Sequence, residues 1–161
     1  MKIGVPKEIK PQENRIGLTP DSVKVLTSNG HKVLVESNGG YEAGFDNEQY
    51  KKAGAKIIDK VGDIFNDSEI IVKVKEPLSN EIKMLREDQI IFTYLHLAAA
   101  KELTEGLVKS KSICIAYETI TDDNGRLPLL APMSAVAGRM SVQAGAHCLE
   151  KNQKGRGILL G

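Results

Sequence analysis

Short, nearly continuous apolar runs recur along the chain, and segments with helical periodicity separate them. The runs occupy residues 3–6, 31–36, 69–74, 89–95 and 112–117, with a weaker run at 56–59. Strands buried on both faces have near-continuous apolar sequences, and helical connections between them are typical of parallel sheets. The pattern therefore predicts an α/β fold, a Rossmann-like parallel sheet with helices on both faces. The strand order stays open.

Helix start and stop signals lie between the apolar runs. Residues 19–21 supply a threonine N-cap, a proline at the first helical position and an acid in the first turn, and Gly30 ends this helix. Asp46 can cap a second helix that Gly54 ends. Further helical segments are expected at residues 61–66, 81–86 and 100–110.

A polar, turn-rich segment at residues 121–128 interrupts the alternation and indicates a domain boundary. A long helix is expected from about Pro132 to Asn152, with small residues on many sides, which suggests packing against more than one neighbour. Residues 155–161 then begin another strand and stop at a glycine, where a nucleotide-binding loop would begin. We expect a first domain at residues 1–128, and a linking helix plus the first strand of a truncated second domain at residues 129–161.

Composition narrows the function classes. The 161 residues include 22 basic and 21 acidic side chains, 4% aromatics and no Trp, which argues against a nucleic-acid partner. No apolar run approaches the roughly 20 residues that span a bilayer, and the charged N-terminus lacks a signal-peptide core. A cytoplasmic protein without membrane partners is expected. Cys114 and Cys148 have no metal-type spacing, so we expect two buried small hydrophobes rather than a disulfide or metal site.

Candidate chemistry lies just past three of the predicted strands. Arg15, Lys75 and His96 each follow an apolar run. In open α/β sheets, ligands bind beyond the carboxyl ends of the strands. A guanidinium, an ammonium and an imidazole that converge there favour a small anionic acid with a reactive carbonyl. The sequence therefore predicts a substrate pocket.

The two cations each have a simpler interpretation. Arg15 lies in a polar loop and can hold a carboxylate through two parallel hydrogen bonds, but composition alone favours a solvated arginine. Glu8 is interpreted as a structural partner for Arg15. Lys75 can polarise a carbonyl oxygen or hold a carboxylate, or it can be a surface lysine at a strand end, for which Lys73 is the obvious comparison. Strand alternation places Lys73 and Lys75 on the same face and does not separate them.

His96 follows a strand and precedes three alanines that leave space for a ligand. Histidine can give or take a proton near neutral pH, although a lone histidine is more often structural. Tyr94 shares a strand face with His96, and lining the pocket and ordinary core packing are equally favoured for it. Ser134 and Met133 begin the long helix, where a hydroxyl and backbone N–H groups suit an anion or carboxamide. The alternative is a plain helix cap by Ser134.

Five segments together resemble a known family. They are MKIGVPKEIKPQENRIGLTP at residues 1–20, VKVKEPL around Lys75, FTYLHLA around His96, ITDDNGRLPLLAPMSAVAGRMSVQAGA, and the final GRGILLG. From residue 1 to 161 the chain resembles the N-terminal part of the alanine dehydrogenase family. The related proton-translocating transhydrogenases share the opening and the KVKEP-like segment, whereas YLHLA favours the dehydrogenases.

The resemblance implies the N-terminal substrate domain of a two-domain, NAD-dependent dehydrogenase that interconverts L-alanine with pyruvate and ammonia. It assigns the substrate carboxylate to Arg15, carbonyl or imine polarisation to Lys75 and His96, and the nicotinamide end of NAD to Met133 and Ser134. It also implies a homo-oligomer. Because the resemblance places most of the NAD domain beyond Gly161, the chain alone is expected to be inactive.

Three alternatives stay open from the sequence. One is a transhydrogenase-like subunit that binds NAD(H) without an amino-acid pocket, and another is a truncated, non-catalytic binding or assembly module. Composition also fits a flavodoxin-like domain, but no flavin phosphate loop follows the first strand.

Overall fold

The computed structural model describes residues 1–160, which belong to two compact units. The first unit is Met1–Tyr117 and the second begins at Glu118. The division at residue 128, which the polar, turn-rich segment at residues 121–128 suggests, stays a prediction.

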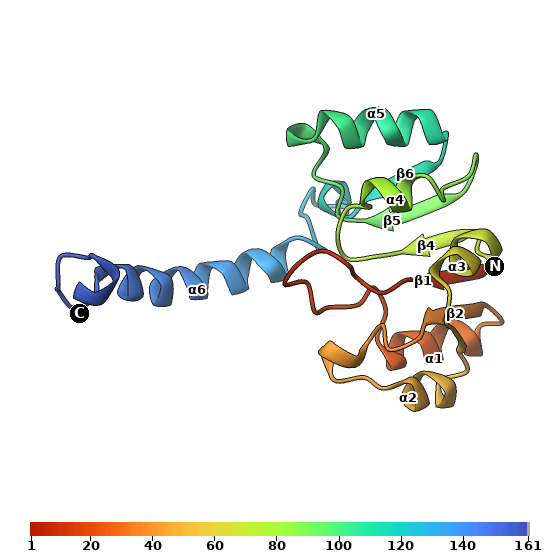
Figure 1. Ribbon diagram of the computed structural model, residues 1–161, viewed down its shortest axis with the longest axis horizontal. Helices are drawn as coiled ribbons and strands as arrows, with labels where there is room; N and C mark the ends of the chain where they lie inside the picture. Colours follow the sequence, from red (N-terminus) through yellow and green to blue (C-terminus); the bar gives the residue numbers. More distant parts are fainter. Residues whose placement is uncertain (161) are drawn as a thin grey trace. The chain divides into compact units, whose positions relative to one another are not determined.

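The first unit contains a six-stranded sheet in the order β3-β2-β1-β4-β5-β6 (Figure 1). Every neighbouring pair is parallel. This is the strand order of doubly wound nucleotide-binding folds, so the predicted Rossmann-like sheet is confirmed. The strands are β1 (Lys2–Val5), β2 (Lys32–Glu36), β3 (Lys56–Ile58), β4 (Ile70–Val72), β5 (Ile90–Thr93) and β6 (Ile113–Ala116).

Most helices form where the local signals predict them, but the helix expected at residues 81–86 is instead Ser79–Ile82, and residues 83–86 are not helical. Thr19 Oγ1 accepts from the Ser22 N–H at the start of the first helix. The second begins with a capping box in which the Asp46 carboxylate and the Gln49 side chain each accept a backbone N–H of the other residue. The helices are α1 (Pro20–Ser28), α2 (Asn47–Lys52), α3 (Val61–Asp67), α4 (Ser79–Ile82), α5 (Lys101–Ser110) and, in the second unit, α6 (Ala131–Leu149).

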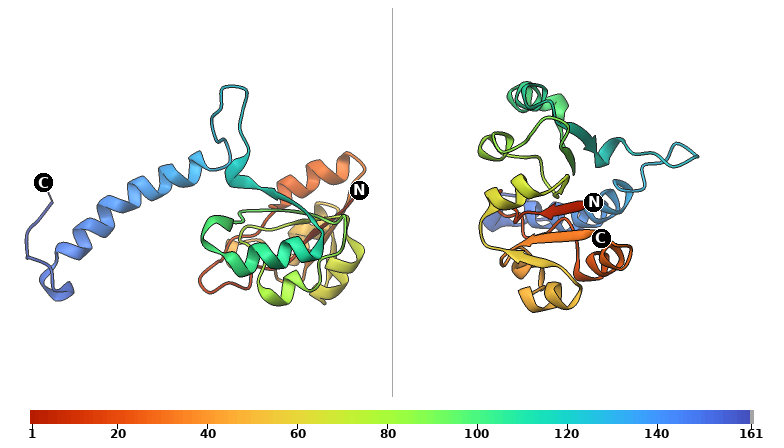
Figure 2. Two further views of the ribbon diagram at one scale, coloured as in Figure 1. Left: turned by 90° about the horizontal axis from the view of Figure 1, so that it is seen from above. Right: turned by 90° about the vertical axis from the view of Figure 1, so that its right-hand side faces the viewer.

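Side chains that alternate along the strands divide the core into two clusters, one on each face. The β1 and β2 residues Ile3 and Val33 pack with Val23 of α1 on one face. On the other face, Ile71 and Ile91 pack with residues of α3 and α5. Figure 2 shows α1 and α5 on opposite sides of the sheet. The clusters confirm that helices cover both faces.

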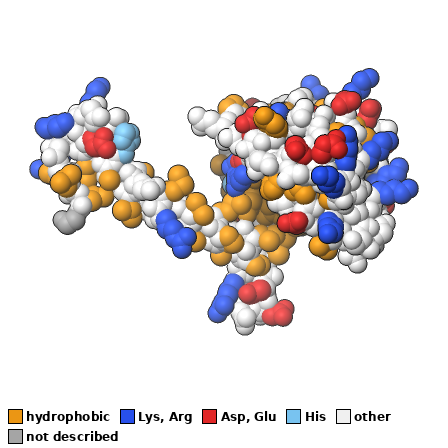
Figure 3. All heavy atoms as spheres, turned by 90° about the horizontal axis from the view of Figure 1, so that it is seen from below, with side chains coloured by type: hydrophobic (Ala, Val, Ile, Leu, Met, Phe, Trp, Pro, Cys, Tyr) orange, Lys and Arg blue, Asp and Glu red, His pale blue; other side chains and the backbone are white. Residues whose placement is uncertain are grey.

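The second unit is mainly α6, and none of its described residues is buried. Figure 3 shows hydrophobic side chains on the surface of this helix. Its exposed residues include Val136, Met140 and Val142. The expected strand at residues 155–161 is wrong for the described part, since residues 154–160 form no strand. A strand needs a hydrogen-bonded neighbour, and none of the described strands pairs with this segment. Gly161 lies outside the described residues.

Both cysteines are free and exposed, so the prediction that they are buried is wrong. Cys114 lies on β6 at the edge of the sheet, and Cys148 lies on α6, which buries none of its residues. Apolar character alone could not reveal either environment.

None of the described helices combines the length and apolar character that a bilayer crossing requires.

Candidate functional site

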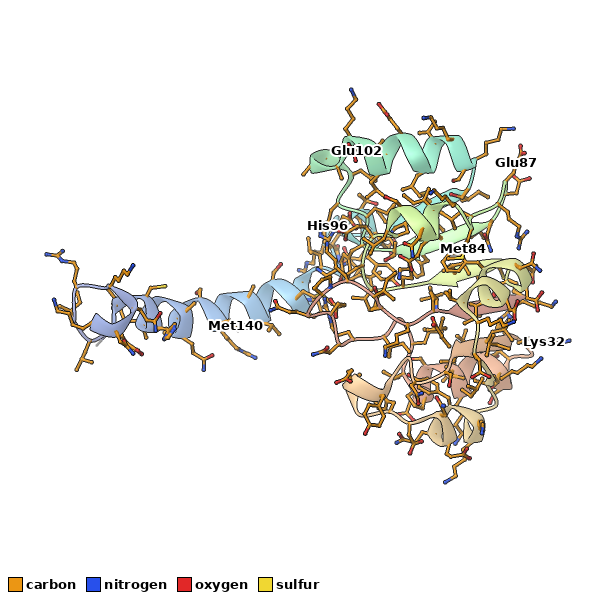
Figure 4. All side chains as sticks on the ribbon, in the orientation of Figure 1. Lys32, Met84, Glu87, His96, Glu102 and Met140 are labelled. Carbon is orange, nitrogen blue, oxygen red and sulfur yellow. The ribbon has the colours of Figure 1, made fainter. Side chains whose placement is uncertain are left out.

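The strand order brings the candidate side chains to one edge of the sheet. From β1 the chain adds β2 and β3 on one side and then β4, β5 and β6 on the other, so the direction of strand addition reverses between β1 and β4. Because these strands are parallel, the segments after them, which carry Arg15, Lys75 and His96, begin at the same edge. Figure 4 shows His96 at this edge, and Lys32 and Glu87 at the opposite one. The predicted convergence therefore agrees with the sheet topology.

The loop that carries Arg15 is anchored by the residues that follow it. Ile16 is buried in the core cluster of β1 and β2. Gly17 lies so close to β4 that an added Cβ would be 2.6 Å from the Val72 carbonyl oxygen. The next carbonyl, of Leu18, accepts a 2.9 Å hydrogen bond from the Tyr50 hydroxyl. Arg15 is therefore presented by a fixed segment.

Arg15 already holds a carboxylate in the bidentate manner. Its Nε and Nη2 donate to the two oxygens of Glu13 at 2.7 and 2.6 Å. The hydrogen bond from Arg15 is the main cause that lowers the pKa of Glu13, and the Lys75 charge contributes to the lowering. The same bond raises the pKa of Arg15, with smaller contributions from Tyr94 and Glu8. Arg15 can thus bind a carboxylate, and Lys75 and Tyr94 are close enough to influence the charges of this pair.

Lys73 is not a surface lysine, which corrects the comparison made from sequence. Its side chain is 1% exposed, and its Nζ lies 2.7 Å from Glu81 Oε1 and 3.3 Å from Glu8 Oε2. Lys75, two residues later, is only half-buried. Glu8 and Glu81 are charged partners for Lys73, so burial of its ammonium is compensated. These three residues are here called the buried charge cluster.

Glu8 has a second role, and its ion pair is with Lys73 rather than the expected Arg15. Its Oε1 accepts the backbone N–H of Val74 at 2.6 Å and that of Lys75 at 3.3 Å. Glu81 Oε2 accepts the Leu78 N–H at 2.8 Å. The buried charge cluster therefore joins the segment after β1, which carries Glu8, to the segment after β4 at both Val74 and Leu78, on either side of Lys75.

Lys75 is also held by β5. The Tyr94 N–H donates to the Val74 carbonyl at 3.2 Å, which continues the β4–β5 pairing past both strands. The Thr93 hydroxyl donates to the Lys75 carbonyl at 2.8 Å. The Lys75 backbone is therefore held by Glu8, from the segment after β1, and by Thr93 of β5, while the Lys75 side chain is half-buried.

His96 has a left-handed backbone, with φ 51° and ψ 39°, which non-glycine residues adopt rarely and often at functional sites. Its side chain is 55% exposed. The ring stacks on Tyr94, with centroids 6.1 Å apart and planes at 28°. Tyr94 is buried and packs edge-on against Tyr117, whose burial raises its pKa. Tyr94 is thus both a core residue and the surface on which His96 lies.

Glu76 joins the segments after all three strands. One carboxylate oxygen pairs with the Lys10 ammonium, and the other lies 3.5 Å from His96 Nδ1. Burial acts to raise the pKa of Glu76, but the hydrogen bond from Lys10, one from its own backbone and the nearby Lys10 and His96 charges leave it below its usual value. The carboxylate is therefore held in its ionised form.

Met133 and Ser134 lie in the first turn of α6, and both side chains are exposed. Their backbone N–H groups both donate to the Leu130 carbonyl at 3.1 Å. Leu130 is the N-cap residue, so Ser134 is not the cap. The N–H groups that the sequence suggested for an anion are therefore occupied, and the Ser134 hydroxyl and Met133 side chain are exposed.

Sequence reasoning missed the roles of Lys73, Glu81 and Glu76. The sequence does contain one sign of the role of Lys73, which is a charged residue inside an otherwise apolar run. Such a residue must either end the strand or have a buried partner of opposite charge. Its partners, separated by 65 and 8 positions, could not be identified from spacing. Among residues 1–160, no group of three or more His, Cys, Asp or Glu side chains is placed to hold a metal ion.

The fold and this edge define a doubly wound α/β domain with basic side chains, among them Arg15 and Lys75, on the segments at its topological switch point. Residues 4–137 match the family described as alanine dehydrogenase/PNT, N-terminal domain. The chain belongs to this family.

Curated relatives extend the match over the whole chain. Alanine dehydrogenase from Halomonas elongata is 55% identical over 160 residues, which cover 99% of this chain and 43% of the relative. Alanine dehydrogenase from Geobacillus stearothermophilus is 53% identical over 161 residues, again 43% of the relative. The chain thus spans less than half the length of these relatives.

Solved structures agree with this assignment. An L-alanine dehydrogenase matches with a TM-score of 0.90 and 53% identity, over 100% of this chain and 44% of that one. A transhydrogenase from Sinorhizobium meliloti matches with a TM-score of 0.70 and 25% identity, over 74% of this chain and 36% of that one.

Proposed function

We propose that this chain is the substrate-binding part of an alanine dehydrogenase. The reaction is the reversible conversion of L-alanine, NAD⁺ and water to pyruvate, ammonium, NADH and a proton. The placement of Arg15, Lys75 and His96 at one switch-point edge carries this proposal, in a chain that is 55% identical to a named alanine dehydrogenase.

The three residues have distinct roles in the proposal. Arg15 binds the substrate carboxylate in place of Glu13, since a ligand carboxylate offers the same two oxygens at the same spacing. Lys75 supplies a positive charge toward the carbonyl or imine of the substrate, which stabilises the charge that develops on oxygen or nitrogen. His96 exchanges the proton. Tyr94 supports His96 through the stacking of their rings and lines the pocket.

NAD is the proposed cofactor. The exposed Ser134 hydroxyl and Met133 side chain fit contact with a carboxamide, whereas the N–H groups of that turn do not, since the Leu130 carbonyl occupies them. When bound, NAD accepts or supplies the hydride, and the protein contributes alignment and charge. The chain spans under half of its relatives' length, and the role we propose for this part is substrate binding.

Localisation and assembly complete the proposal. Two exposed free thiols fit a reducing compartment, so we place the protein in the cytoplasm. The exposed apolar side chains of α6, including Val136, Met140 and Val142, favour a homo-oligomer. Light scattering of the chain and of a Val136→Ser/Met140→Ser variant tests the second point, since a monomeric wild type contradicts it.

Pyruvate binding to the purified chain, measured by isothermal titration calorimetry, tests the site. We expect saturable binding that falls about tenfold or more in Arg15→Lys, because an ammonium cannot reproduce the bidentate contact. Arg86→Lys is the matched control: this arginine precedes β5, at the opposite edge, and should leave the affinity unchanged. Absence of pyruvate binding to the wild type, or equal loss in both variants, contradicts the proposal.

The transhydrogenase match supports a second candidate, a subunit that binds NAD(H) without an amino-acid pocket. Titration with NADH separates the two functions. NADH binding without pyruvate binding favours the transhydrogenase-like subunit, whereas pyruvate binding that depends on Arg15 favours the dehydrogenase. A non-catalytic assembly module predicts neither, but mixed oligomers with a full-length alanine dehydrogenase.

A further inference from the structure

The Glu76 carboxylate has one satisfied and one unsatisfied oxygen. Oε1 pairs with Lys10, while Oε2 is buried and accepts no hydrogen bond. A buried acceptor without a donor is costly, commonly about 1–3 kcal/mol and more for a charged group. Such an atom marks either stored strain or a contact that forms in another state of the site.

The charged neighbour that faces this oxygen is His96, whose Nδ1 lies 3.5 Å away. This separation is too long for a good hydrogen bond, but catalytic hydrogen bonds are often long before the ligand binds and tighten in the complex. The His96 ring is also restricted from another direction, because it stacks on the buried Tyr94. A small ring movement against Tyr94 brings Nδ1 within bonding distance of Glu76.

We propose that Glu76 is a positioning residue for His96, and that its Oε2 accepts the Nδ1–H of the imidazole. Nδ1 then keeps its proton throughout, and Nε2 is the nitrogen that exchanges a proton with the ligand. Lys10 serves the pair indirectly, since it holds the carboxylate ionised and in place. The pairing accounts for the unsatisfied oxygen, and it is consistent with the left-handed backbone of His96, whose Nδ1 lies 3.5 Å from that oxygen.

The part that concerns the ligand rests on the proposed function, and its proton balance is simple. In the direction of alanine oxidation, the amine of the carbinolamine is protonated, and neutral Nε2 accepts the hydroxyl proton as the C–N bond breaks, so that ammonia leaves and the carbonyl forms. In the reverse direction Nε2–H donates that proton to the carbonyl oxygen as ammonia adds. The Nδ1–H bond to Glu76 is intact in both states, so the imidazole keeps one orientation.

Nitrogen-15 NMR of the histidine-labelled chain tests the pairing without any ligand. The chain has three histidines, and a His96→Asn variant identifies the His96 signals. At alkaline pH, where the ring is neutral, we expect the Nδ1–H tautomer in the wild type and a shift toward the Nε2–H tautomer in Glu76→Met. Glu76→Gln retains an acceptor oxygen and should keep Nδ1–H. Lys10→Met, which removes the other partner of Glu76, should also keep it.

A wild-type His96 in the Nε2–H form, or a tautomer that Glu76→Met leaves unchanged, overturns the proposal. If Glu76→Met fails to fold, the wild-type and Glu76→Gln spectra decide by themselves. Pyruvate titration of the same samples separates this inference from the proposed function. An Nδ1–H tautomer that depends on Glu76 in a chain that does not bind pyruvate supports the pairing and refutes the dehydrogenase site. Where pyruvate binds, we expect about tenfold weaker binding in Glu76→Met and near wild-type binding in Glu76→Gln.

Discussion

Two sets of charges lie at the same sheet edge and differ in burial. The buried charge cluster of Glu8, Lys73 and Glu81 has side chains that are 1–2% exposed, and its oxygens and ammonium meet one another or backbone N–H groups. The second set, here called the rim, consists of Arg15, Lys75 and His96. Arg15 is 46% exposed and His96 55% exposed. Similar residue types thus occupy opposite environments within a few positions of sequence.

The difference in burial decides which charges can change partners. A buried ion loses several kcal/mol of hydration, so the cluster cannot release a partner without a large loss of stability. The Glu13–Arg15 pair is open to solvent on one side only, since the Arg15 side chain is 46% exposed and the Glu13 side chain 7% exposed, so a ligand carboxylate can replace Glu13 at lower cost than a partner within the cluster. The buried charge cluster therefore fixes the backbone of the site, and in the proposed function the rim binds the ligand. The predictions below test this division.

Lys73→Met should have the largest effect. The substitution leaves the carboxylates of Glu8 and Glu81 without their shared cation, and breaking a buried pair in this way typically costs about 3–5 kcal/mol. Since small domains are stable by roughly 5–15 kcal/mol, the variant should be close to unfolded. Urea denaturation followed by circular dichroism measures the loss.

Lys75→Met is the matched control for this experiment. The same substitution two residues later removes a half-buried ammonium whose backbone contacts remain, so the loss of stability should stay below about 1 kcal/mol. Although Lys75→Met changes stability little, it should lower the affinity for pyruvate, because Lys75 is one of the proposed binding residues. Equal losses of stability at the two positions would show that the division between cluster and rim is wrong.

Most of the fold could be predicted because its signals are local. The threonine cap at residue 19, the acid at Asp46 and the glycine at 54 mark helix ends through contacts within a few residues. The apolar runs mark strands that are buried on both faces, which restricts the sheet to a parallel one. The topology then places Arg15, Lys75 and His96 at one edge, as the sequence predicted.

What could not be predicted depends on partners far along the chain. Lys73 resembles Lys75 in sequence, but tertiary contacts bury it and bring Glu8, 65 positions earlier, and Glu81 to its ammonium. The apolar run before Gly161 meets no described strand and stays irregular. Cys114 is exposed because β6 is the edge strand. In each case the sequence gives the residue type, but contacts with residues far along the chain determine whether that residue is buried, exposed or part of a strand.

Alkaline pH should have the next largest effect, through the anchor of the Arg15 loop. Burial raises the pKa of Tyr50 to about 12, from an ordinary value of 10.0. Because the unfolded chain loses this proton first, the contribution to stability is complete below pH 10 and is lost as pH rises toward 12. The total is roughly 2–3 kcal/mol. Thermal or urea unfolding across this window measures it.

Tyr50→Phe separates this contribution from other alkaline effects. Near neutral pH the variant should be less stable by about 1 kcal/mol, because the hydrogen bond to the Leu18 carbonyl is lost. Above pH 10 the difference should shrink and then reverse, since phenylalanine has no proton to lose. Tyr41→Phe, at a tyrosine that is 66% exposed, should follow the wild-type curve. Parallel pH curves for the wild type and Tyr50→Phe would contradict a buried phenol.

Glu13→Gln should have the smallest effect on stability and an informative effect on binding. The Glu13–Arg15 pair lowers the pKa of Glu13, so its contribution is present above the ordinary carboxyl value of 4.5 and is lost as pH falls through the lowered one. The Arg15 side chain is 46% exposed and the Glu13 side chain 7% exposed, so solvent screens the pair from the Arg15 side and should keep this contribution at about 1 kcal/mol or less. The loss of stability at neutral pH should therefore be barely measurable by urea denaturation.

The binding result tests whether Glu13 occupies the place of a ligand carboxylate. In Glu13→Gln the guanidinium keeps its charge and loses its competing anion, so pyruvate affinity at neutral pH should rise by a few-fold in calorimetry. Glu87→Gln is the control, since Glu87 pairs with Lys111 before β5, at the opposite edge, and should change neither stability nor affinity noticeably. A weaker affinity in Glu13→Gln would mean that Glu13 orients Arg15 for the ligand instead of competing with it. Arg15 would then belong with the preorganised, buried contacts, and the rim would reduce to Lys75 and His96.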